Sequence, residues 1–261
     1  MPNLGLGSNL SNVKSGGLIT PGIVTDNLVL KHNYSKGSVI PVSDGAVFFD
    51  GTNDYINCGS DSSIDMGTSA FSVTCWVYLN VIGDLCLVGK GPSITTEDSG
   101  WSVSVYNNGR AYLDLNNSGR DATYSTVGAI TANQWYHIAV VRAAADGAGR
   151  NIYIDGVENT ESNQSFAISD AGDASIDLWF GDVPTGGSRE LDGYMCNVGI
   201  WKDRVLTQPE IKSIMNKNYA GLTTGTGGET ENLVSWWNLD EGTGTTANDS
   251  HGSNTGTATN F

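Results

Sequence analysis

Short apolar runs separated by tight-turn dipeptides are the feature that most limits how this chain can fold. In AVFFDGTNDYINCG, residues 46–59, one apolar run ends at Asp50-Gly51 and a second short run extends from Asp54 to Cys58. Asp-Gly between such runs is a strong turn signal, because glycine tolerates the positive φ that a tight turn demands. The stretch therefore predicts two strands that meet at a polar corner.

The same pattern continues along most of the chain. The stretch 70–80, AFSVTCWVYLN, alternates most clearly and predicts a strand with one apolar face and one amphipathic face. Its apolar face would hold Phe71, Val73, Cys75, Val77 and Leu79. Asn108-Gly109, between the runs 101–106 and 111–115, predicts a hairpin. Further strands are expected at 27–34, 84–89, 134–142, 151–157, 176–182, 194–201 and 232–239.

One stretch has helical character. In TQPEIKSIMN, residues 207–216, Thr207 can cap the first turn and Pro209 suits that turn. Its apolar stripe is made by Ile211, Ile214 and Met215, which predicts packing and no chemistry. Many evenly spaced short strands with one short helix predict an all-β fold, a two-sheet antiparallel β-sandwich, and not an α/β sheet.

Six stretches, in their order along the chain, resemble a known domain family. They are FDGTNDYI, FSVTCWVYL, NQWYHIAVVR, NIYIDGV, ELDGYMCNVGIW and RVLTQPEIKSIMN, all within residues 46–216. Together they resemble laminin G-like domains of the concanavalin A-like lectin/glucanase superfamily, which implies a jelly-roll sandwich. Cys196 and Asn197 depart from the resemblance, since acidic residues are usual at these places in the family.

We expect four segments along the chain. Residues 1–26 mix glycine with scattered leucine and isoleucine and predict an extended N-terminal arm. Residues 27–220 would form the sandwich, and the Gly/Thr-rich stretch 221–231 predicts a linker. Residues 232–261 begin with NLVSWWNL, which shares a pattern with NLVLKHNY at 27–34. This last segment is expected to complete either its own sandwich or a neighbouring one.

Charge and composition narrow the classes of partner. The net charge of −15 disfavours nucleic acid and anionic membrane surfaces. No apolar run approaches the roughly 20 residues that span a bilayer, so no membrane insertion is expected. The four cysteines form no C-x-x-C pair, and Cys75 and Cys86 are predicted to be small buried hydrophobes. The N-terminus lacks a basic start followed by an apolar region, so no signal peptide is expected.

Catalytic patterns are incomplete in this sequence. Retaining glycan hydrolases need two carboxylates about 5 Å apart, and the E-x-D-x-x-E signature of such relatives is met only by Glu190 and Asp192, with Met195 at the third place. His137 lies within a strand and is predicted to be a buried structural histidine, whereas His251 lies in a polar loop. We therefore expect a protein that is not an enzyme.

A calcium site is the best chemical candidate, because members of the resembled fold often bind Ca²⁺ through loop carboxylates. Asp50 and Asp54 lie in the first corner, and Asp240 and Asp249 lie in the C-terminal segment. If that segment packs beside the corner, these oxygens could converge on Ca²⁺. The alternative is that they only accept hydrogen bonds from their own turns.

Carbohydrate binding is the commonest use of the fold that the resemblance implies. Sugars stack on exposed aromatic rings and bond to polar side chains at loop ends. The candidates that border polar loops are Trp101, Tyr106, Arg110, Tyr112, Trp179 and Asp182. For each of these, packing in the core is the competing interpretation.

The layout of an arm ahead of one sandwich resembles virion surface proteins of bacteriophages. This implies a capsid- or tail-associated decoration or adhesion protein, made in the host cytoplasm and exposed on the virion surface. The arm would bind capsid or tail proteins, the chain would form a homo-oligomer, and the sandwich would face host-surface glycans. The alternatives are a free Ca²⁺-dependent carbohydrate-binding module or lectin and, disfavoured by the missing carboxylates, a glycan hydrolase.

Overall fold

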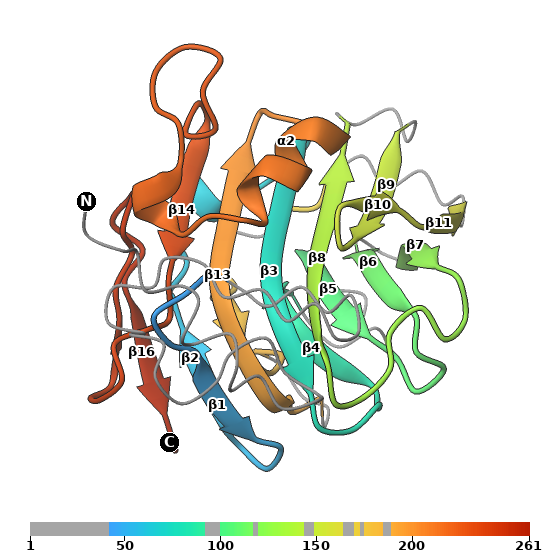
Figure 1. Cartoon of the computed structure of the whole chain (residues 1–261), viewed down its shortest axis with the longest axis vertical. Helices are drawn as coiled ribbons and strands as arrows, with labels where there is room; N and C mark the ends of the chain where they lie inside the picture. The colour runs from blue at the N-terminus through green and yellow to red at the C-terminus, as the bar shows by residue number, and fades with distance from the viewer. Residues whose placement is uncertain are drawn as a thin grey trace, which may run out of the picture.

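The computed structural model describes residues 42–91, 100–116, 120–143, 149–163, 170–172, 175–184 and 189–261. The predicted arm at 1–26 and the predicted strand at 27–34 lie outside these residues. The described residues form two antiparallel sheets packed face to face, with one short α-helix on the outside of the first sheet (Figure 1). The predicted antiparallel sandwich is confirmed.

The first sheet has seven strands in the order β1-β13-β3-β8-β9-β10, and β14 pairs with β13 beside this path. Its strands are β1 (Val47–Asp50), β3 (Phe71–Leu79), β8 (Trp135–Arg142), β9 (Arg150–Ile154), β10 (Val157–Glu158), β13 (Asp192–Lys202) and β14 (Leu233–Trp237). The long central strands β13 and β3 are therefore the scaffold of this sheet.

The second sheet has nine strands in the order β11-β7-β6-β5-β4-β12-β2-β16-β15. Its strands are β2 (Tyr55–Asn57), β4 (Leu85–Lys90), β5 (Gly100–Val105), β6 (Ala111–Asn116), β7 (Arg120–Ser125), β11 (Thr160–Asn163), β12 (Trp179–Phe180), β15 (Thr246–Ala247) and β16 (Gly256–Thr259). Two 3₁₀ turns, η1 (Ser62–Ile64) and η2 (Tyr219–Gly221), lie in the connections.

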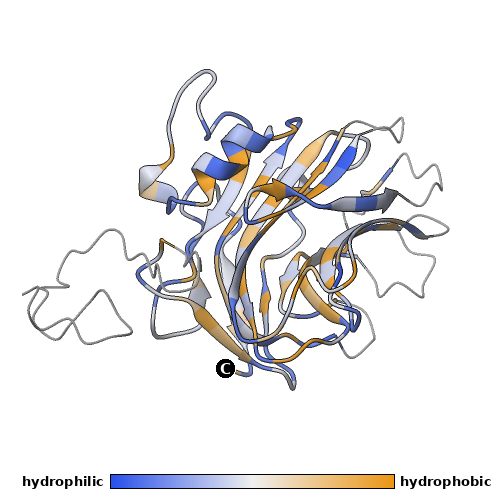
Figure 2. Ribbon diagram, turned by 45° about the vertical axis from the view of Figure 1, so that its right-hand side comes forward, coloured by the Kyte–Doolittle hydropathy of each residue, from blue (hydrophilic) through white to orange (hydrophobic). Residues whose placement is uncertain are grey.

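The core lies between the inner faces of the two sheets, and Figure 2 colours many residues along the strands as hydrophobic. The predicted apolar face of β3 is confirmed, because Phe71, Val73, Cys75, Val77 and Leu79 all belong to this core. Phe49 of β1 and Ile56 of β2 face the same core from opposite sheets. The alternation in the first corner therefore fixes which side chains of β1 and β2 face outward.

The helix α2 (Gln208–Ile214) lies on the outer face of the seven-stranded sheet. Its first turn is held by the Glu210 carboxylate, which accepts a hydrogen bond from the backbone N–H of Thr207 at 2.7 Å. Its apolar side chains Ile211 and Ile214 pack in a second core cluster with Trp201 and Trp236. The helix predicted from the sequence is confirmed, and its stripe serves packing.

The predicted Asn-Gly hairpin joins β5 to β6. The backbone N–H of Tyr106 donates to the carbonyl of Arg110 at 3.0 Å, and Gly109 has φ +71°. A Cβ atom at Gly109 would lie 2.5 Å from the carbonyl oxygen of Ile130, so both the backbone angle and the space require glycine.

The C-terminal segment takes part in both sheets of its own chain. β14 pairs with β13, and β16 pairs with β2. The stretch 221–231, predicted as a linker, is anchored to the sandwich: Trp201 donates its Nε1–H to the carbonyl of Glu229 at 2.7 Å, and Lys217 donates to both carboxylate oxygens of Glu229 at 2.7 Å. It is a loop of the same folded unit. No helix of the described residues is long and apolar enough to cross a membrane.

Candidate functional site

A polar hollow lies on the outer face of the nine-stranded sheet, over β12, β2 and β16. It has a volume of about 410 Å³ and is lined by Tyr55, Asn57, Cys58, Gly59, Asp177, Thr255, Thr257 and Thr259. We call it the β2 hollow. The register of the strands explains the lining, because Tyr55 lies opposite Thr259 and Asn57 lies opposite Thr257. Since Ile56 between them faces the core, both Tyr55 and Asn57 must face outward.

Tyr55, one of the residues that line the β2 hollow, is backed by Trp179. The ring of Tyr55 stacks on that of Trp179 with centroids 3.9 Å apart and planes 9° apart. Both residues are half-buried, so the stack restricts the Tyr55 ring while the residue stays partly accessible. A restricted, partly exposed ring is suited to stacking on the apolar face of a ligand.

A hydrogen-bonded amide and carboxylate stand beside this pair. Asn57 donates from Nδ2 to Oδ2 of Asp177 at 2.8 Å and accepts from the backbone N–H of Gly59 at 2.7 Å. These bonds orient both side chains before any ligand arrives. The hydroxyls of Thr255 and Thr257, which are exposed, add further donors and acceptors. The arrangement can bind a ligand that has an apolar face and several hydroxyls.

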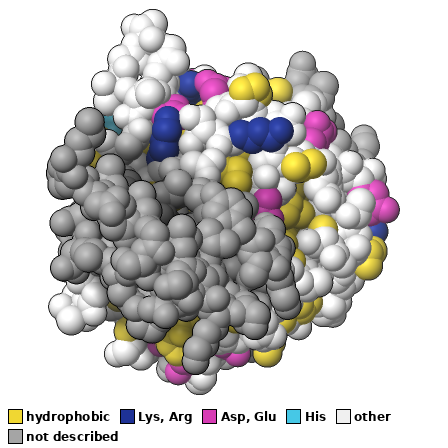
Figure 3. Space-filling model, viewed as in Figure 1, with side chains coloured by type: hydrophobic (Ala, Val, Ile, Leu, Met, Phe, Trp, Pro, Cys, Tyr) yellow, Lys and Arg dark blue, Asp and Glu magenta, His cyan; other side chains and the backbone are white. Residues whose placement is uncertain are grey.

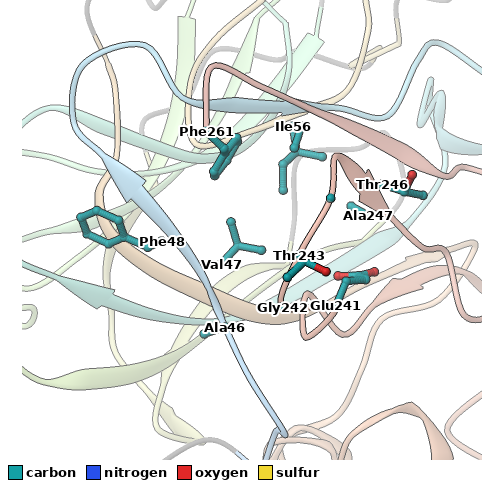
Figure 4. Close-up of a pocket in the computed structure, with 12 residues that line it drawn as sticks. Ala46, Val47, Phe48, Ile56, Glu241, Gly242, Thr243, Thr246, Ala247 and Phe261 are labelled. Atoms are coloured by element: carbon teal, nitrogen blue, oxygen red, sulfur yellow. The ribbon is translucent and has the colours of Figure 1, made fainter.

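A second hollow, the edge groove, lies where β1 faces β15 and β16 at the open side of the sandwich. It has a volume of about 340 Å³ and is mostly apolar, with Val47, Ile56, Ala247 and Phe261 among its lining residues. Figure 4 shows Val47 and Phe48 on opposite sides of β1, and both are among the lining residues. Few polar groups converge here, so the groove offers less specific recognition than the β2 hollow.

The predicted sugar-binding residues separate into different places. Trp101 is a correction: its side chain is fully buried in the core and its ring packs against Phe71 at 5.5 Å. The reason is the register of β5, where Trp101 pairs with Leu115 on the inner face. Trp179 lies at the β2 hollow behind Tyr55. Asp182 is half-buried, its Oδ1 accepts from the N–H of Val183, and burial raises the pKa of its carboxyl.

The other three predicted residues come together in a tyrosine ladder at the far end of the same sheet. Tyr106 and Tyr112 have ring centroids 4.2 Å apart, and Tyr112 and Tyr124 are 5.3 Å apart. Arg110 lies 4.5 Å above the ring of Tyr124 and forms an ion pair with Glu161 at 2.6 Å. Polar groups of this ladder are bonded to other side chains of the protein: the Tyr106 hydroxyl to Asp114 and Arg189, and Arg110 to Glu161.

The four carboxylates predicted to hold Ca²⁺ do not fit a calcium site in the described structure. Asp249 accepts hydrogen bonds from the backbone N–H groups of Trp236, His251, Gly252 and Asn254. Asp54 accepts from the N–H of Asp50, and Asp50 accepts from Thr52. Among the described residues, no three His, Cys, Asp or Glu side chains come together as metal ligands. The alternative interpretation, carboxylates that order their own turns, describes Asp50, Asp54 and Asp249.

Burial raises the pKa of the carboxyls of Asp54 and Asp240, and the neighbouring Glu241 and Asp44 raise the pKa of Asp240 further. His137 is buried as predicted, and burial lowers its pKa to about 3. His251 is exposed and its Nδ1 lies 3.1 Å from the hydroxyl of Tyr219. Neither histidine adjoins the β2 hollow lining, so these groups belong to the framework.

Comparison with known families identifies the fold. A family model, Laminin_G_3, described as the concanavalin A-like lectin/glucanases superfamily, matches residues 50–212. The chain belongs to this superfamily. The laminin G-like resemblance of the six sequence stretches is thereby confirmed. The strands β14, β15 and β16 lie beyond the matched residues, although they complete both sheets of this superfamily member.

Solved structures show the same lectin-like sandwich. A protein of Bacteroides ovatus described as a candidate carbohydrate binding protein has a TM-score of 0.59 and 18% identity, covering 82% of this chain and 57% of that one. The chain thus spans just over half of that protein's length. A domain of a Geobacillus stearothermophilus arabinanase, solved with arabinotriose, has a TM-score of 0.46 and 17% identity over 68% of this chain and 82% of that one. At 18% identity the likeness to the Bacteroides ovatus protein shows the fold alone. A search of curated proteins finds no match.

Sequence reasoning missed most of the β2 hollow. Tyr55 and Asn57 stood in the corner motif, and their spacing of two around Ile56 was a signal that both face outward. Asp177 gave no signal, because only the pairing of β12 with β2 brings it to Asn57. The threonines lie in the C-terminal segment 232–261, whose sequence did not show that β16 would pair with β2.

Proposed function

We propose that this superfamily member binds carbohydrate at the β2 hollow and does not cleave it. The observation that carries the proposal is the stacked Tyr55–Trp179 pair beside the oriented Asn57–Asp177 pair. A sugar ring has an apolar face that can stack on Tyr55 and hydroxyls that can bond to Asn57, Asp177 and Thr257. The likeness in fold to the Bacteroides ovatus protein, described as a candidate carbohydrate binding protein, supports the same class of ligand.

The chemistry of the hollow supports binding without hydrolysis. Asp177 is the single carboxylate among the residues that line it. Retaining glycosidases use two carboxyl groups about 5 Å apart, and inverting enzymes use two at a wider separation. One carboxylate bonded to an amide can accept a sugar hydroxyl, but it has no acid–base partner in this lining.

A glycan array of immobilised oligosaccharides tests the proposal, followed by titration calorimetry with the strongest binder. Tyr55→Ala and Asn57→Ala should each weaken binding by about tenfold or more, since each removes a stacking surface or an oriented hydrogen-bond pair worth about 1.4 kcal/mol. Tyr124→Ala is the matched control: it is a half-buried tyrosine on the same sheet, in the ladder away from the hollow. Unchanged affinity of the Tyr55 and Asn57 variants, or no glycan binding by the wild type, would overturn the proposal.

We also propose, from the resemblance in layout, that the protein is a virion component attached through residues 1–26 to a capsid or tail. The support is the resemblance itself, together with the net charge of −15, which suits an exposed soluble surface. Light scattering of the full chain with and without EDTA is the test. We expect a homo-oligomer whose mass does not change on chelation; a monomer that loses thermal stability with EDTA would favour a free Ca²⁺-dependent lectin module instead.

A further inference from the structure

Four aromatic side chains meet on the outer face of the seven-stranded sheet, opposite the β2 hollow. Phe48 of β1 pairs with Tyr194 of β13, Tyr194 pairs with Tyr78 of β3, and Tyr78 pairs with Trp135 of β8. Directly paired residues point to the same face, so the four rings form one group across four neighbouring strands. We call this group the aromatic patch.

Two rings of the aromatic patch are exposed to solvent, and the other two are half-buried. Phe48 is 44% exposed and Tyr194 is 38% exposed, while Tyr78 and Trp135 are half-buried. The Tyr194 centroid lies 4.9 Å from that of Phe48, 5.9 Å from Tyr78 and 6.4 Å from Trp135. Tyr194 is therefore the centre of the patch.

The backbone beside the patch requires a glycine. Gly193, next to Tyr194, has φ +155°, and a Cβ atom there would lie 1.9 Å from the carbonyl oxygen of Tyr78. Only glycine fits this backbone conformation and this space. The register of β13 and β3 places Tyr194 directly opposite Tyr78, so the patch is built into the sheet.

A polar band runs directly beside the patch on the same face. Asp50 and Asp192 lie two residues from Phe48 and Tyr194 on their strands, and the register pairs them. Asn80 lies two residues from Tyr78, just after the end of β3. Asn80 donates from Nδ2 to Oδ1 of Asp192 at 2.6 Å, which orients both groups. Asp50 is exposed, and Asp192 and Asn80 are half-buried. The face therefore offers aromatic rings and oriented oxygen acceptors side by side.

The opposite side of the patch is closed. There, Trp76 and Cys196 are buried with Met215, just after α2, and Trp135 packs at the edge of this cluster. Figure 3 views this face and shows basic side chains toward the end that carries α2. A ligand on the patch would thus meet the helix end on one side and the acidic band on the other.

We propose that the aromatic patch and its polar band are a second glycan-binding surface, for a soluble, uncharged glycan chain. The proposal rests on the proposed function only for the class of ligand, and its residues are on the other sheet. Sugar rings would stack on Phe48 and Tyr194, and hydroxyls would donate to Asp50 and Asp192. The carboxylates repel uronic acid and sulfate groups. Neighbouring rings are tilted by 46° to 79°, so the patch is not a flat platform for a crystalline polysaccharide.

Affinity electrophoresis of the full chain in gels that contain one soluble polysaccharide each tests the proposal. The probes are a neutral β-glucan, a neutral xylan, a neutral mannan, and alginate as the anionic comparison. The double variant Phe48→Ser/Tyr194→Ser should lose at least tenfold in affinity for the neutral polymer that the wild type retards most, and Asp192→Asn should lose severalfold. Alginate should not retard any form. Far-ultraviolet circular dichroism confirms that each variant is folded.

The outcomes separate this inference from the proposed function. If Tyr55→Ala weakens binding but Phe48→Ser/Tyr194→Ser does not, the second surface is wrong and the β2 hollow stands. If only the patch variants weaken binding, the patch is the site and the β2 hollow is wrong. A patch variant that changes oligomer mass in light scattering without changing glycan affinity would identify a contact between copies and overturn the inference. A wild type that no polysaccharide retards would overturn it as well.

Discussion

The outer faces of the two sheets are covered in different ways. On the seven-stranded sheet, α2 and the chain after it cover outward-facing tryptophans with apolar contacts. Trp76, Trp201 and Trp236 are each 1% exposed or less. Their ring nitrogens still donate hydrogen bonds, as Trp76 does to the carbonyl of Met215 at 3.0 Å. This face is stabilised chiefly by burial of large apolar rings.

On the nine-stranded sheet, polar side chains are buried on the outer face. Ser102, Ser104 and Asp114 are 2% exposed or less. The Tyr106 hydroxyl donates to Asp114 at 3.1 Å and accepts from Nη2 of Arg189 at 2.7 Å. Arg189 also lies 4.7 Å from the Tyr106 ring centroid. Directional bonds to charged groups hold this face together.

The difference indicates where each face can carry a site. Apolar burial stabilises only the side chains that α2 and the chain after it contact. The aromatic patch lies beyond these contacts and stays uncovered. A hydrogen-bonded face fixes its side chains individually, and polar groups can remain oriented near solvent, as Asn57 and Asp177 are at the β2 hollow. Three experiments, two substitutions and one pH dependence, test this contrast between an apolar-covered and a hydrogen-bonded face.

Trp76→Ala should have the largest effect. It removes a fully buried indole beneath the chain that follows α2 and leaves a cavity, so we expect a loss of about 3–5 kcal/mol in the free energy of unfolding. Guanidinium denaturation followed by circular dichroism measures it. Trp76→Phe, which keeps most of the ring but loses the bond to Met215, should cost distinctly less. Equal losses in the two variants would show that the hydrogen bond, and not apolar burial, stabilises this face.

The alternation of β3 made this face partly predictable. The pattern placed Trp76 and Tyr78 on the second face and predicted that it was amphipathic, and the caps around Thr207 predicted the helix. The path of the chain after β13 decides that Trp76 is covered and Tyr78 is left open. That path is set by tertiary packing and cannot be predicted from the alternation of β3. Strands such as β7, RDATYS, escaped prediction because polar residues are buried on one of its faces and apolar alternation is absent.

Tyr106→Phe should have an intermediate effect on the other face. It removes one hydroxyl that bridges Arg189 and Asp114 and leaves the ring in place, so the expected loss is about 1.5–3 kcal/mol, the usual range for hydrogen bonds to charged groups. The same denaturation measurement applies. Tyr124→Phe, in the ladder beyond Tyr112, is the matched control and should change little. A loss at Tyr106 no larger than at Tyr124 would contradict a face stabilised by directional bonds.

The sites were less predictable than the fold, and for a physical reason. Trp101 was chosen because it borders a polar loop, but the side chain of a strand residue is placed by register, and register depends on partners far along the chain. The same holds for Asp177 and for the four rings of the aromatic patch, which come from four separate strands. One sequence supplies the alternation but not the partner opposite each residue.

The smallest effect that we expect is a pH dependence on the apolar-covered face. His137 lies opposite Trp76, its ring is buried, and its Nδ1 has no hydrogen-bond partner among the described residues. Burial lowers its pKa to about 3, whereas the pKa of an unfolded histidine is about 6.5. Below about pH 6.5 the folded state therefore binds fewer protons than the unfolded state. The contribution of His137 to stability is complete above this pH and declines as the pH falls below it. From about pH 7.5 to about pH 5.5, His137 should cost about 1.4 kcal/mol.

Denaturation at both pH values, in the wild type and in His137→Phe, isolates this contribution from the carboxylates, which titrate in both proteins. The variant should lose less stability than the wild type over the same interval, whatever its absolute stability. This face would then tolerate a neutral imidazole but not an imidazolium, whereas the opposite face holds the charges of Asp114 and Arg189 around one hydroxyl. Identical pH slopes in the two proteins would mean that protonated His137 is solvated or paired in the folded state, and the apolar face would then be as accommodating to charge as the polar one.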